Sequence, residues 1–513
     1  MNQESRQAAA VEKAETHRAP APPLDHAAVR SIIIGIMLAM FLSALEQTIV
    51  APALPTIGRS LADMENLSWV VTAYLLSTVV ATPLFGKLSD IYGRRSMMLI
   101  SVSVFIAGSI ACALAPTMAT LVLARALQGL GGGGILPLAQ TVIADILSPR
   151  ERPIFQGYSS VMFMAASILG PVLGGVLTDY VHWSLIFWIN APLGAAALLM
   201  TDRALRRLPR NDRPHQLDLV GATLMVAAAL ALLLALSSGG IRFRWSSPEI
   251  LALVGSSAVL WLLFALRLVK APEPFIPWTM IKEPVVRTIV VAGFFSVGTI
   301  IGLSIFIPLY LELVLGQSAS GSGLALIAFV VAASLGSMTA GRLISRLTHY
   351  KRVPIVGLPL SILVLIVLAI EPAGHSLAGI LALLALGGVG LGTMYPMTTV
   401  VIQNAVEPHR LGIATGTLNF FRQLGGAIVV AAFAAIVLGG IDAGERGLTL
   451  TMRSGVFGSA ADFAILFRFV FLAAAAFLAL ALLAIALIEE RPLRGPALQP
   501  MAPAAPSAPV AAE

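Results

Sequence analysis

The chain has 513 residues, of which 58% are hydrophobic and only 12% are charged. A soluble protein of this length would carry far more charge on its surface, so the composition excludes an ordinary globular protein. The net charge of +7 would suit a nucleic-acid-binding protein. The Lys and Arg residues, however, gather in alternate loops between apolar segments, which is the pattern that membrane topology produces. No nucleic-acid partner is therefore expected.

Long apolar segments occupy most of the chain, and each is long enough to cross a membrane. A hydrocarbon layer roughly 30 Å thick needs about 20 apolar residues per helix. Unbroken runs favour helices, because the strands of a membrane β-barrel would show short alternating runs. Transmembrane helices are predicted at 31–53, 67–86, 97–115, 118–145, 158–178, 184–200, 218–236, 249–269, 288–314, 322–343, 354–370, 376–403, 412–439 and 463–488. The predicted fold class is an all-α integral membrane protein with about fourteen transmembrane helices.

The basic residues predict how these helices are oriented. Loops on one side of the arrangement hold most of the cations, among them Lys87, Arg94, Arg95, Arg203, Arg206, Arg207, Arg210, Arg213, Arg342, Arg346, Lys351 and Arg352. Because cytoplasmic loops carry the excess of Lys and Arg, both termini are predicted to be cytoplasmic. The Ala- and Pro-rich ends at 1–29 and 491–513 are predicted to be disordered cytoplasmic tails.

One stretch of the first half recurs in the second half. The segment GLGGGGILP at 129–137 corresponds to GVGLGTMYP at 388–396. The same separation relates two later pairs, Pro149 with Pro408 and Gly157 with Gly416. Two related halves that flank a central path are the plan of alternating-access transporters.

The repeat divides the chain into parts. It predicts an N-terminal six-helix bundle at 30–200, a basic cytoplasmic linker at 201–217, two inserted transmembrane helices at 218–270 and a C-terminal six-helix bundle at 271–490. The copy is imperfect, since GKL at 86–88 corresponds to GRL at 341–343 but Ser345 replaces Asp90. The first half is therefore expected to hold chemistry that the second half lacks.

Six short motifs carry a resemblance to a known family. They are GKLSDIYGRR at 86–95, LEQTIVAPALP at 45–55, RALQG at 125–129, GPVLGG at 170–175, FWINAPLG at 187–194 and FRQLGG at 421–426. The first resembles the signature between spans two and three of the major facilitator superfamily. The others resemble motifs of its fourteen-span drug:proton antiporters, often called EmrB/QacA-type. The resemblance covers residues 31–490, with one departure: the first-span acid of that branch is usually Asp, whereas this chain has Glu46.

This resemblance implies the major facilitator fold, with two six-helix bundles and two extra central helices. It also implies a proton-coupled antiporter that exports amphipathic drugs or other toxic small molecules across a bacterial cytoplasmic membrane by alternating access. The proton gradient would supply the energy, so no cofactor and no metal are expected. The expected partners are the small amphipathic substrate and membrane lipid. A periplasmic adaptor protein, the oligomeric state and the identity of the substrate are left open.

Glu46 is the candidate proton carrier. Span one reaches its outer boundary near Ala53, so Glu46 lies roughly 10 Å inside it at about 1.5 Å per residue. A carboxylate at that depth is costly unless it is paired, hydrated or protonated. Arg125 enters span four from the same side to a similar depth, and the two can pair if spans one and four face each other. Gln128, one turn deeper, is a candidate for lining the cavity; the alternative is that these residues only fix helix packing.

Further polar residues lie inside the later spans. Arg422 lies near the middle of span thirteen, where a guanidinium must find acceptors, and Asn419 shares its helical face. Arg422 is, like Glu46 and Arg125, a candidate for proton or substrate coupling, and Asn419 is a candidate for lining the cavity, with packing as the alternative. Glu312, near the outer end of span nine, is either a second acid for coupling or a solvated interfacial side chain. An acid in the pocket makes lipophilic cations a natural cargo, while Arg125 and Arg422 leave neutral and anionic compounds open.

The loop after span two is a candidate conformational latch, as the resemblance implies, formed by Gly86, Asp90, Gly93, Arg94 and Arg95. Asp90 can accept hydrogen bonds from the N-terminal amides of the next helix, or pair with Arg94 or Arg95. Gly86 leaves room for the close approach of a helix from the other half. The alternative is a capped loop with ordinary topogenic charges.

Gly170, Pro171, Gly174 and Gly175 form the candidate antiporter motif of span five. The Gly-Pro pair interrupts the backbone hydrogen bonds of the helix, and the Gly-Gly pair lets neighbouring backbones pack closely. Kinked helices with small residues suit a rocking interface, although they also occur in static bundles.

Other function classes fit the sequence less well. An uptake symporter on the same scaffold is the nearest alternative, but the Gly-Pro motif of span five favours antiport. A membrane enzyme is disfavoured, because the seven His residues lie in tails, loops or span ends and no HExxH, nucleophile elbow or paired metal-ligand spacing occurs. A receptor that does not transport would not require acids along an intramembrane path.

Overall fold

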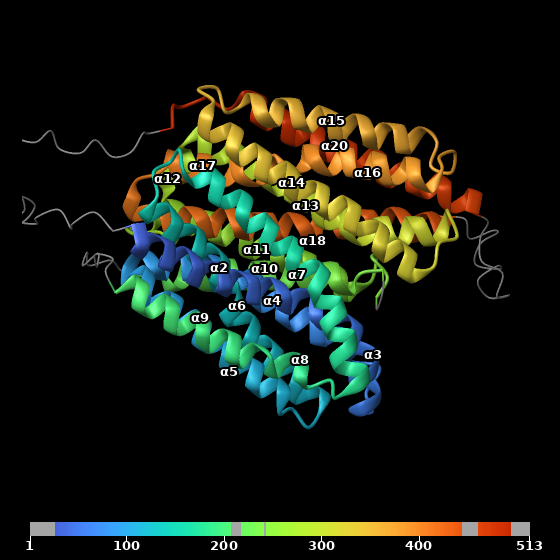
Figure 1. Cartoon of the computed structure of the whole chain (residues 1–513), viewed down its shortest axis with the longest axis horizontal. Coiled ribbons are helices and arrows are strands. Elements are labelled where there is room, and N and C mark those ends of the chain that lie inside the picture. The colour runs from blue at the N-terminus through green and yellow to red at the C-terminus, as the bar shows by residue number, and fades with distance from the viewer. Residues whose placement is uncertain (1–25, 207–216, 241–242, 444–459, 494–513) are drawn as a thin grey trace, which may run out of the picture.

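The structure, a computed structural model, describes residues 26–206, 217–240, 243–443 and 460–493. Within these ranges 14 helices are long and apolar enough to cross a membrane. Figure 1 shows them running along one common direction in an elongated bundle. The predicted all-α membrane fold is confirmed. Most of the predicted linker and nearly all of the two predicted tails lie outside the described residues.

A first group of helices fills the lower part of Figure 1. The long members are α2 (His26–Ile49), α4 (Leu67–Tyr92), α5 (Arg94–Ala113), α6 (Met118–Ile146), α7 (Arg152–Tyr180) and α9 (Asn190–Leu205), and the short ones are η1 (Ala51–Ala53), α3 (Leu54–Ser60) and α8 (Leu185–Trp188). Within this first group α4 and α5 pack on α6, while α2 packs on α7 and α9. Helices without a wide polar face need such neighbours on several sides.

A second group of helices fills the upper part of the same view. Its members are α13 (Pro284–Leu313), α14 (Ala319–Arg346), α15 (Arg352–Ile370), α16 (Leu377–Gly392), α17 (Met394–Ala405), η2 (Pro408–Arg410), α18 (Leu411–Ala443) and α20 (Ala460–Leu487). Here α13 packs on α18 and α20, α14 packs on α16, and α15 packs on α16 and α20.

Two inserted helices, α10 (Leu219–Ser238) and α11 (Pro248–Lys270), pack against each other between the two groups. Asp218 holds this pair together, since its carboxylate accepts from the amide of Gly221 at 3.0 Å and forms a salt bridge with Arg267 at 3.0 Å. The short α12 (Trp278–Lys282) then leads into α13.

The two groups meet along two seams. Helix α4 packs against α18, and α7 packs against α14. The inserted pair is asymmetric with respect to these seams, because α10 contacts both α4 and α18. The α4–α18 seam is therefore flanked by an extra helix that joins both of its sides.

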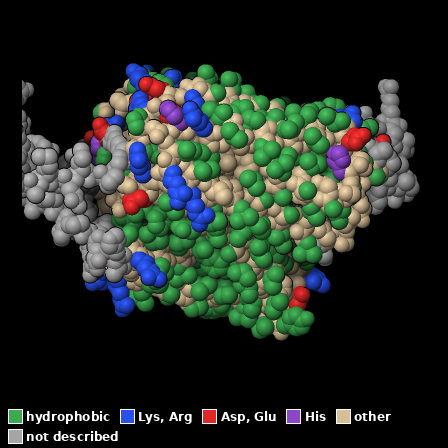
Figure 2. All heavy atoms as spheres, turned by 45° about the horizontal axis from the view of Figure 1, so that its top comes forward, with side chains coloured by type: hydrophobic (Ala, Val, Ile, Leu, Met, Phe, Trp, Pro, Cys, Tyr) green, Lys and Arg blue, Asp and Glu red, His purple; other side chains and the backbone are tan. Residues whose placement is uncertain are grey.

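The surface matches a protein that lies in a membrane. Figure 2 shows hydrophobic side chains covering the middle of one face, with Lys and Arg side chains concentrated toward one end. We call this the basic end; it is the end at which α4 passes into α5 and α14 into α15, with Arg94, Arg95, Arg346 and Lys351. An apolar band between polar ends is what a hydrocarbon layer requires.

Three predicted spans contain breaks that the apolar pattern does not reveal. The first span stops being regular at Ile49, before Pro52, and continues as η1 and α3. The sixth breaks between α8 and α9, and the twelfth breaks at Thr393 between α16 and α17. Pro192 and Pro396 explain the last two breaks, because a proline cannot donate to the carbonyl four residues before it.

Candidate functional site

Glu46 of α2 and Arg125 of α6 form an ion pair inside the first group. Arg125 Nη1 donates to Glu46 Oε1. Glu46 is 0% exposed and Arg125 is 2% exposed, so the pair is shielded from bulk solvent. The two side chains meet because α2 and α6 are in contact, which is the arrangement of spans one and four that pairing requires.

Neutral polar side chains complete the surroundings of this pair. Asn190 Nδ2 donates to Glu46 Oε2 and also to Ser109 Oγ at 3.2 Å. Gln128 accepts from Arg125 Nη1 at 2.6 Å and donates to Ser109 Oγ at 2.7 Å. We call these five residues the carboxylate network. All five are buried, and they join α2, α5, α6 and α9.

Arg125 is held from two further sides. Its Nε donates to the carbonyl oxygen of Val70 at 2.9 Å. Its guanidinium carbon lies 4.3 Å from the centroid of the Tyr74 ring and 5.7 Å from that of Phe187. A guanidinium over an aromatic face gains about 0.5–2 kcal/mol, so these rings stabilise a charge that is buried from bulk solvent.

Local sequence explains how the network is assembled. The break before α9 places Asn190 in the first turn of that helix, next to Glu46. Gly108 brings α5 close to α6, since a Cβ on Gly108 would lie 2.5 Å from the Cα of Gln128. This close approach puts Ser109 within reach of both Asn190 and Gln128. The Oδ1 atom of Asn190 has no hydrogen-bond partner in the described structure.

Arg422 and Asn419 lie together on α18, away from that pair. Asn419 Nδ2 donates to Gln140 Oε1 at 2.6 Å, and Gln140 Nε2 donates to the hydroxyl of Tyr395 at 3.0 Å. Gln140 belongs to α6 of the first group, whereas Tyr395 belongs to α17 of the second. We call Gln140, Tyr395, Asn419 and Arg422 the central polar cluster, which bridges the two groups.

Glu312 stands apart from both sets of residues. It is half-buried near the end of α13, where it accepts a hydrogen bond from the Ser322 hydroxyl at 2.7 Å. Among the residues that the structure describes, no hydrogen bond or salt bridge connects it with Glu46 or Arg422. Of the four predicted coupling residues, the structure brings Glu46 and Arg125 together and leaves Arg422 and Glu312 separate.

Asp90, at the end of α4, binds the start of α18. Its Oδ1 accepts from the amide of Gly412 at 3.0 Å, and its Oδ2 accepts from the amide of Ile413 at 2.8 Å. Arg94 donates to the same carboxylate. A negative charge is stabilised at a helix N-terminus, so Asp90 ties the two groups together at the basic end. Of the two alternatives for Asp90, the pairing with Arg94 is confirmed. The expectation that its amide donors belong to the next helix, α5, is wrong, because the close packing of α4 against α18 brings the α18 amides nearer.

The other members of the candidate latch have different partners. Gly93 links α4 to α5 with φ 87°, a conformation that favours glycine. Arg94 Nε also donates to Asp145 at 2.9 Å, at the end of α6. Arg95 pairs with Asp202 of α9, so it braces the first group and takes no part in the contact with α18.

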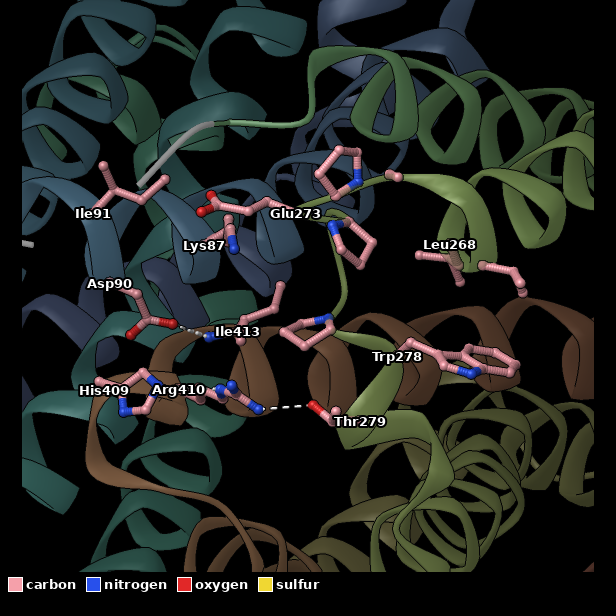
Figure 3. Close-up of a pocket in the computed structure, with 15 residues that line it drawn as sticks. Lys87, Asp90, Ile91, Leu268, Glu273, Trp278, Thr279, His409, Arg410 and Ile413 are labelled. Atoms are coloured by element: carbon pink, nitrogen blue, oxygen red, sulfur yellow. Dashed lines mark hydrogen bonds between the residues drawn. The ribbon is translucent and has the colours of Figure 1, made fainter. Parts of the chain in front are cut away.

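A cavity of about 370 Å³ lies beside the latch. Figure 3 shows Lys87 and Asp90 of α4 on one side of it, with the Glu273 side chain next to Lys87, and Trp278 and Thr279 on the other side. Arg410, before α18, donates to the Thr279 hydroxyl at 2.8 Å. The segment that follows the inserted helices therefore makes direct contact with the α18 side of the latch.

The candidate antiporter motif packs α7 against α2. A Cβ on Gly170 would overlap Thr48, and a Cβ on Gly174 would overlap the carbonyl oxygen of Ile49. Gly175 differs, since nothing lies within 4 Å of its would-be Cβ. The expectation that both later glycines bring backbones together is therefore wrong for Gly175. Helix α7 continues through Pro171 as one helix, so the lost backbone hydrogen bond does not end it.

Comparison with known proteins places this geometry in a family. The sequence profile described as "Major Facilitator Superfamily" matches residues 36–430. The chain belongs to the Major Facilitator Superfamily. It is therefore a multi-pass membrane transporter and not an enzyme.

Relatives within the Major Facilitator Superfamily are named for drug resistance. Multidrug resistance protein 3 of Bacillus subtilis (strain 168) is 30% identical over 410 residues, which are 80% of this chain and 80% of that protein. The multidrug transporter protein MdtP of the same organism is 31% identical over 406 residues, 79% of this chain and 75% of that protein.

Solved structures of the superfamily share the fold. The human organic anion transporter MFSD10 (TETRAN) matches with a TM-score of 0.62 and 17% identity, covering 90% of this chain and 100% of that chain. A bacterial homologue of the iron transporter ferroportin, in an outward-facing state, matches with a TM-score of 0.62 and 12% identity, covering 89% and 98%. At such low identity the likeness shows the fold alone.

Several polar residues of this superfamily member were missed by reasoning from the sequence. Ser109 and Asn190 belong to the carboxylate network, and Gln140 and Tyr395 belong to the central polar cluster. Asn190 lies inside a motif that contributed to the family resemblance, so a polar amide within that apolar segment was an available signal. Hydroxyls and amides are common in membrane helices, so the other three carried no comparable signal.

Proposed function

We propose that this transporter is a proton-coupled antiporter that exports amphipathic drugs or other toxic small molecules. It would act in a bacterial cytoplasmic membrane with both termini in the cytoplasm, as the basic end suggests. The observation that carries the proposal is the fully buried ion pair of Glu46 and Arg125. An ionisable pair inside a membrane protein is costly and by default marks an ion or substrate pathway. The drug-resistance names of the relatives support the class of cargo.

Protonation of Glu46 would change the balance of charge at this site. The neutral acid no longer compensates Arg125, which keeps the Val70 carbonyl and Gln128 as neutral acceptors. Arg125 then carries a buried charge without a counter-ion, a costly state that favours rearrangement of the network. The proton thus biases the conformation of the helices that meet here, namely α2, α5, α6 and α9.

The proton and the cargo need not bind the same atoms. It is enough that each weakens the binding of the other, and this coupling is reciprocal by thermodynamic necessity. Rocking of the two groups would separate Asp90 from the amides of Gly412 and Ile413 when the basic end opens. The structure holds these contacts, so it represents a state that is closed at the basic end.

Dye transport in inverted membrane vesicles tests the proposal. An imposed pH gradient, acidic in the lumen, should drive ethidium into wild-type vesicles, and Glu46→Gln should abolish this gradient-driven uptake while the purified variant still binds the dye. Glu249→Gln, at an exposed acid in the first turn of α11, is the matched control and should transport normally. Equal gradient-driven flux in wild type and Glu46→Gln would defeat the role of Glu46. Release of preloaded dye from the acidic lumen would instead identify a symporter.

A further inference from the structure

Arg422 differs from the other buried arginines of the described structure. Arg94 and Arg125 each form a salt bridge with a carboxylate. Arg152 donates to two carbonyl oxygens at the C-terminal end of α6, where the helix dipole is negative. No described acid forms a salt bridge with Arg422, although its side chain is only 2% exposed.

The partners of Arg422 are neutral. Its Nη2 donates to the carbonyl oxygen of Tyr395 at 3.2 Å, to the hydroxyl of Thr399 at 3.0 Å and to the hydroxyl of Thr398. Its Nη1 donates to Asn419 Oδ1 at 3.2 Å, and its guanidinium carbon lies 4.6 Å from the centroid of the Tyr395 ring. The Nε donor is buried without an acceptor in the described structure.

This arrangement leaves a positive charge without compensation. Neutral oxygens and an aromatic face lower the cost of a buried guanidinium, but they do not cancel its charge as a carboxylate would. A role limited to packing would be served as well by an uncharged side chain of similar volume. An unpaired charge at this depth therefore indicates a counter-ion that arrives during the working cycle.

The position of Arg422 allows such an arrival. Asn419 and Tyr395, which cover the guanidinium, are themselves held by Gln140 of the other group. When the groups rock apart, α6 separates from α17 and α18, and both hydrogen bonds to Gln140 break. Asn419 and the ring of Tyr395 are then free to move from Arg422, which opens toward the path between the groups.

We propose that Arg422 binds the anionic group of the transported compound, a carboxylate or a similar oxyanion on an amphipathic molecule. The inference rests on the proposed transport function and adds one class of cargo, compounds with an anionic group, to cations such as ethidium. Arginine suits this task, because its planar fork of donors matches an oxyanion and its charge persists at any working pH. Tyr395, Thr398, Thr399 and Asn419 are the temporary acceptors that the anion replaces.

A pair of fluorescent probes that differ only in charge tests this subsite. Binding of 1-pyrenebutyrate and of its uncharged amide is measured with the purified full-length protein in lipid nanodiscs. Wild type should bind the carboxylate roughly tenfold more tightly than the amide, or better. Arg422→Gln should lose this preference and keep its affinity for the amide, and Arg422→Lys should keep part of the preference. Arg468→Gln should behave like wild type, because this exposed arginine donates, among the described residues, only to the carbonyls of Ala369 and Ile370.

Asn419→Asp gives an independent test that does not remove the cation. It places a permanent carboxylate beside Arg422, so the carboxylate probe should lose about tenfold in affinity while the amide probe does not. Equal affinities of the two probes in wild type would overturn the proposal. So would an equal loss for both probes in Arg422→Gln with unchanged thermal unfolding, or an unchanged carboxylate affinity in Asn419→Asp.

The two proposals fail separately. Proton-driven ethidium uptake that survives in Glu46→Gln would remove proton coupling through that acid and leave the anion subsite intact. If wild type binds the carboxylate and the amide probe equally well, the proposed anion subsite is excluded, while the proposal of proton-driven export of cations stands.

Discussion

Gly86 of α4 and Gly412 of α18 lie backbone against backbone at the basic end, with no space for a side chain on either. A Cβ on Gly86 would lie 2.5 Å from the carbonyl oxygen of Gly412, and a Cβ on Gly412 would overlap the carbonyl oxygen of Gly86. The same kind of contact recurs at the α7–α14 seam, where a Cβ on Gly341 would overlap the carbonyl oxygen of Pro153. Gly341 corresponds to Gly86 in the internal repeat, so the two seams close by equivalent backbone contacts.

The charges at these two contacts are not equivalent. Asp90 reaches across the α4–α18 seam to the amides of Gly412 and Ile413. Its counterpart in the repeat is Ser345, whose hydroxyl donates to the carbonyl oxygen of Arg342 within its own helix at 2.8 Å. The electrostatic latch therefore acts on one seam, which is also the seam flanked by α10.

Gly86→Ala is expected to force the basic end open. The added methyl group would overlap backbone atoms, and such overpacking costs about 1–3 kcal/mol, enough to shift a closed–open equilibrium several-fold. Spin labels at Arg150→Cys and Glu407→Cys, in a Cys112→Ala background, measure the separation across the basic end, and their mean distance should increase. Gly255→Ala is the control, because nothing lies within 4 Å of its Cβ position. An unchanged distance in Gly86→Ala would contradict a role of this contact in closure.

Asp90→Asn is expected to slow turnover while leaving the affinity for cargo nearly unchanged. The amide side chain has one acceptor oxygen and no charge, so it loses the attraction to the α18 N-terminus and the pairing with Arg94. A loss of about 1–2 kcal/mol in the closed state corresponds to roughly a tenfold slower cycle, if closure of the basic end limits the rate. Initial rates of dye transport and equilibrium dye binding measure the two quantities. Ser345→Ala, at the matching position of the other seam, should alter neither, and a large loss of affinity in Asp90→Asn would argue against a latch.

Asn190→Ala is expected to impair proton-driven transport without preventing folding. The substitution removes the donor to Glu46 Oε2, and a hydrogen bond to a charged group contributes about 1.5–3 kcal/mol. Gradient-driven dye flux should therefore fall by about tenfold or more while dye binding to the purified protein persists. Asn404→Ala provides the comparison, because within the described part of the chain the Asn404 amide donates only to the carbonyl oxygen of Pro492. Equal flux in the two variants would remove Asn190 from the coupling mechanism.

The membrane spans could be predicted from the sequence because hydropathy sums over many residues. The breaks within them could not. Pro192 and Pro396 lie just after interruptions, whereas Pro83 and Pro137 lie inside helices that continue. Each proline removes one backbone hydrogen bond, and packing against neighbouring helices determines whether the chain continues as a regular helix. Whether a helix continues through its proline therefore depends on tertiary packing, which no local sequence pattern contains.

The candidate site likewise contains residues that could be predicted from the sequence and residues that could not. Depth within the spans placed Glu46 and Arg125 at one level, since the cost of a buried charge makes each of them conspicuous. Ser109 and Asn190 complete the network without charge, and their role depends on which helices lie side by side. The partner of Asp90 escaped prediction for the same reason, because α4 and α18 are far apart in the sequence and meet only in the folded bundle.

Asp218→Ala is expected to destabilise the inserted helices. The Asp218 carboxylate caps α10 through the Gly221 amide and also binds Arg267 and the amide of Phe275, the latter at 3.3 Å. Loss of a helix cap alone costs about 0.5–2 kcal/mol, so the midpoint of thermal unfolding in detergent should fall. Asp218→Asn should lie between this variant and wild type, because an amide oxygen still caps α10 but lacks the charge that attracts Arg267. Glu249→Ala removes an exposed acid in the first turn of α11, where a charge adds little stability, so its midpoint should fall less than that of Asp218→Ala. If wild type and the three variants unfold at one temperature, Asp218 does not anchor α10 and α11 to each other. The packing of α10 against the α4–α18 seam would then depend on apolar contacts alone.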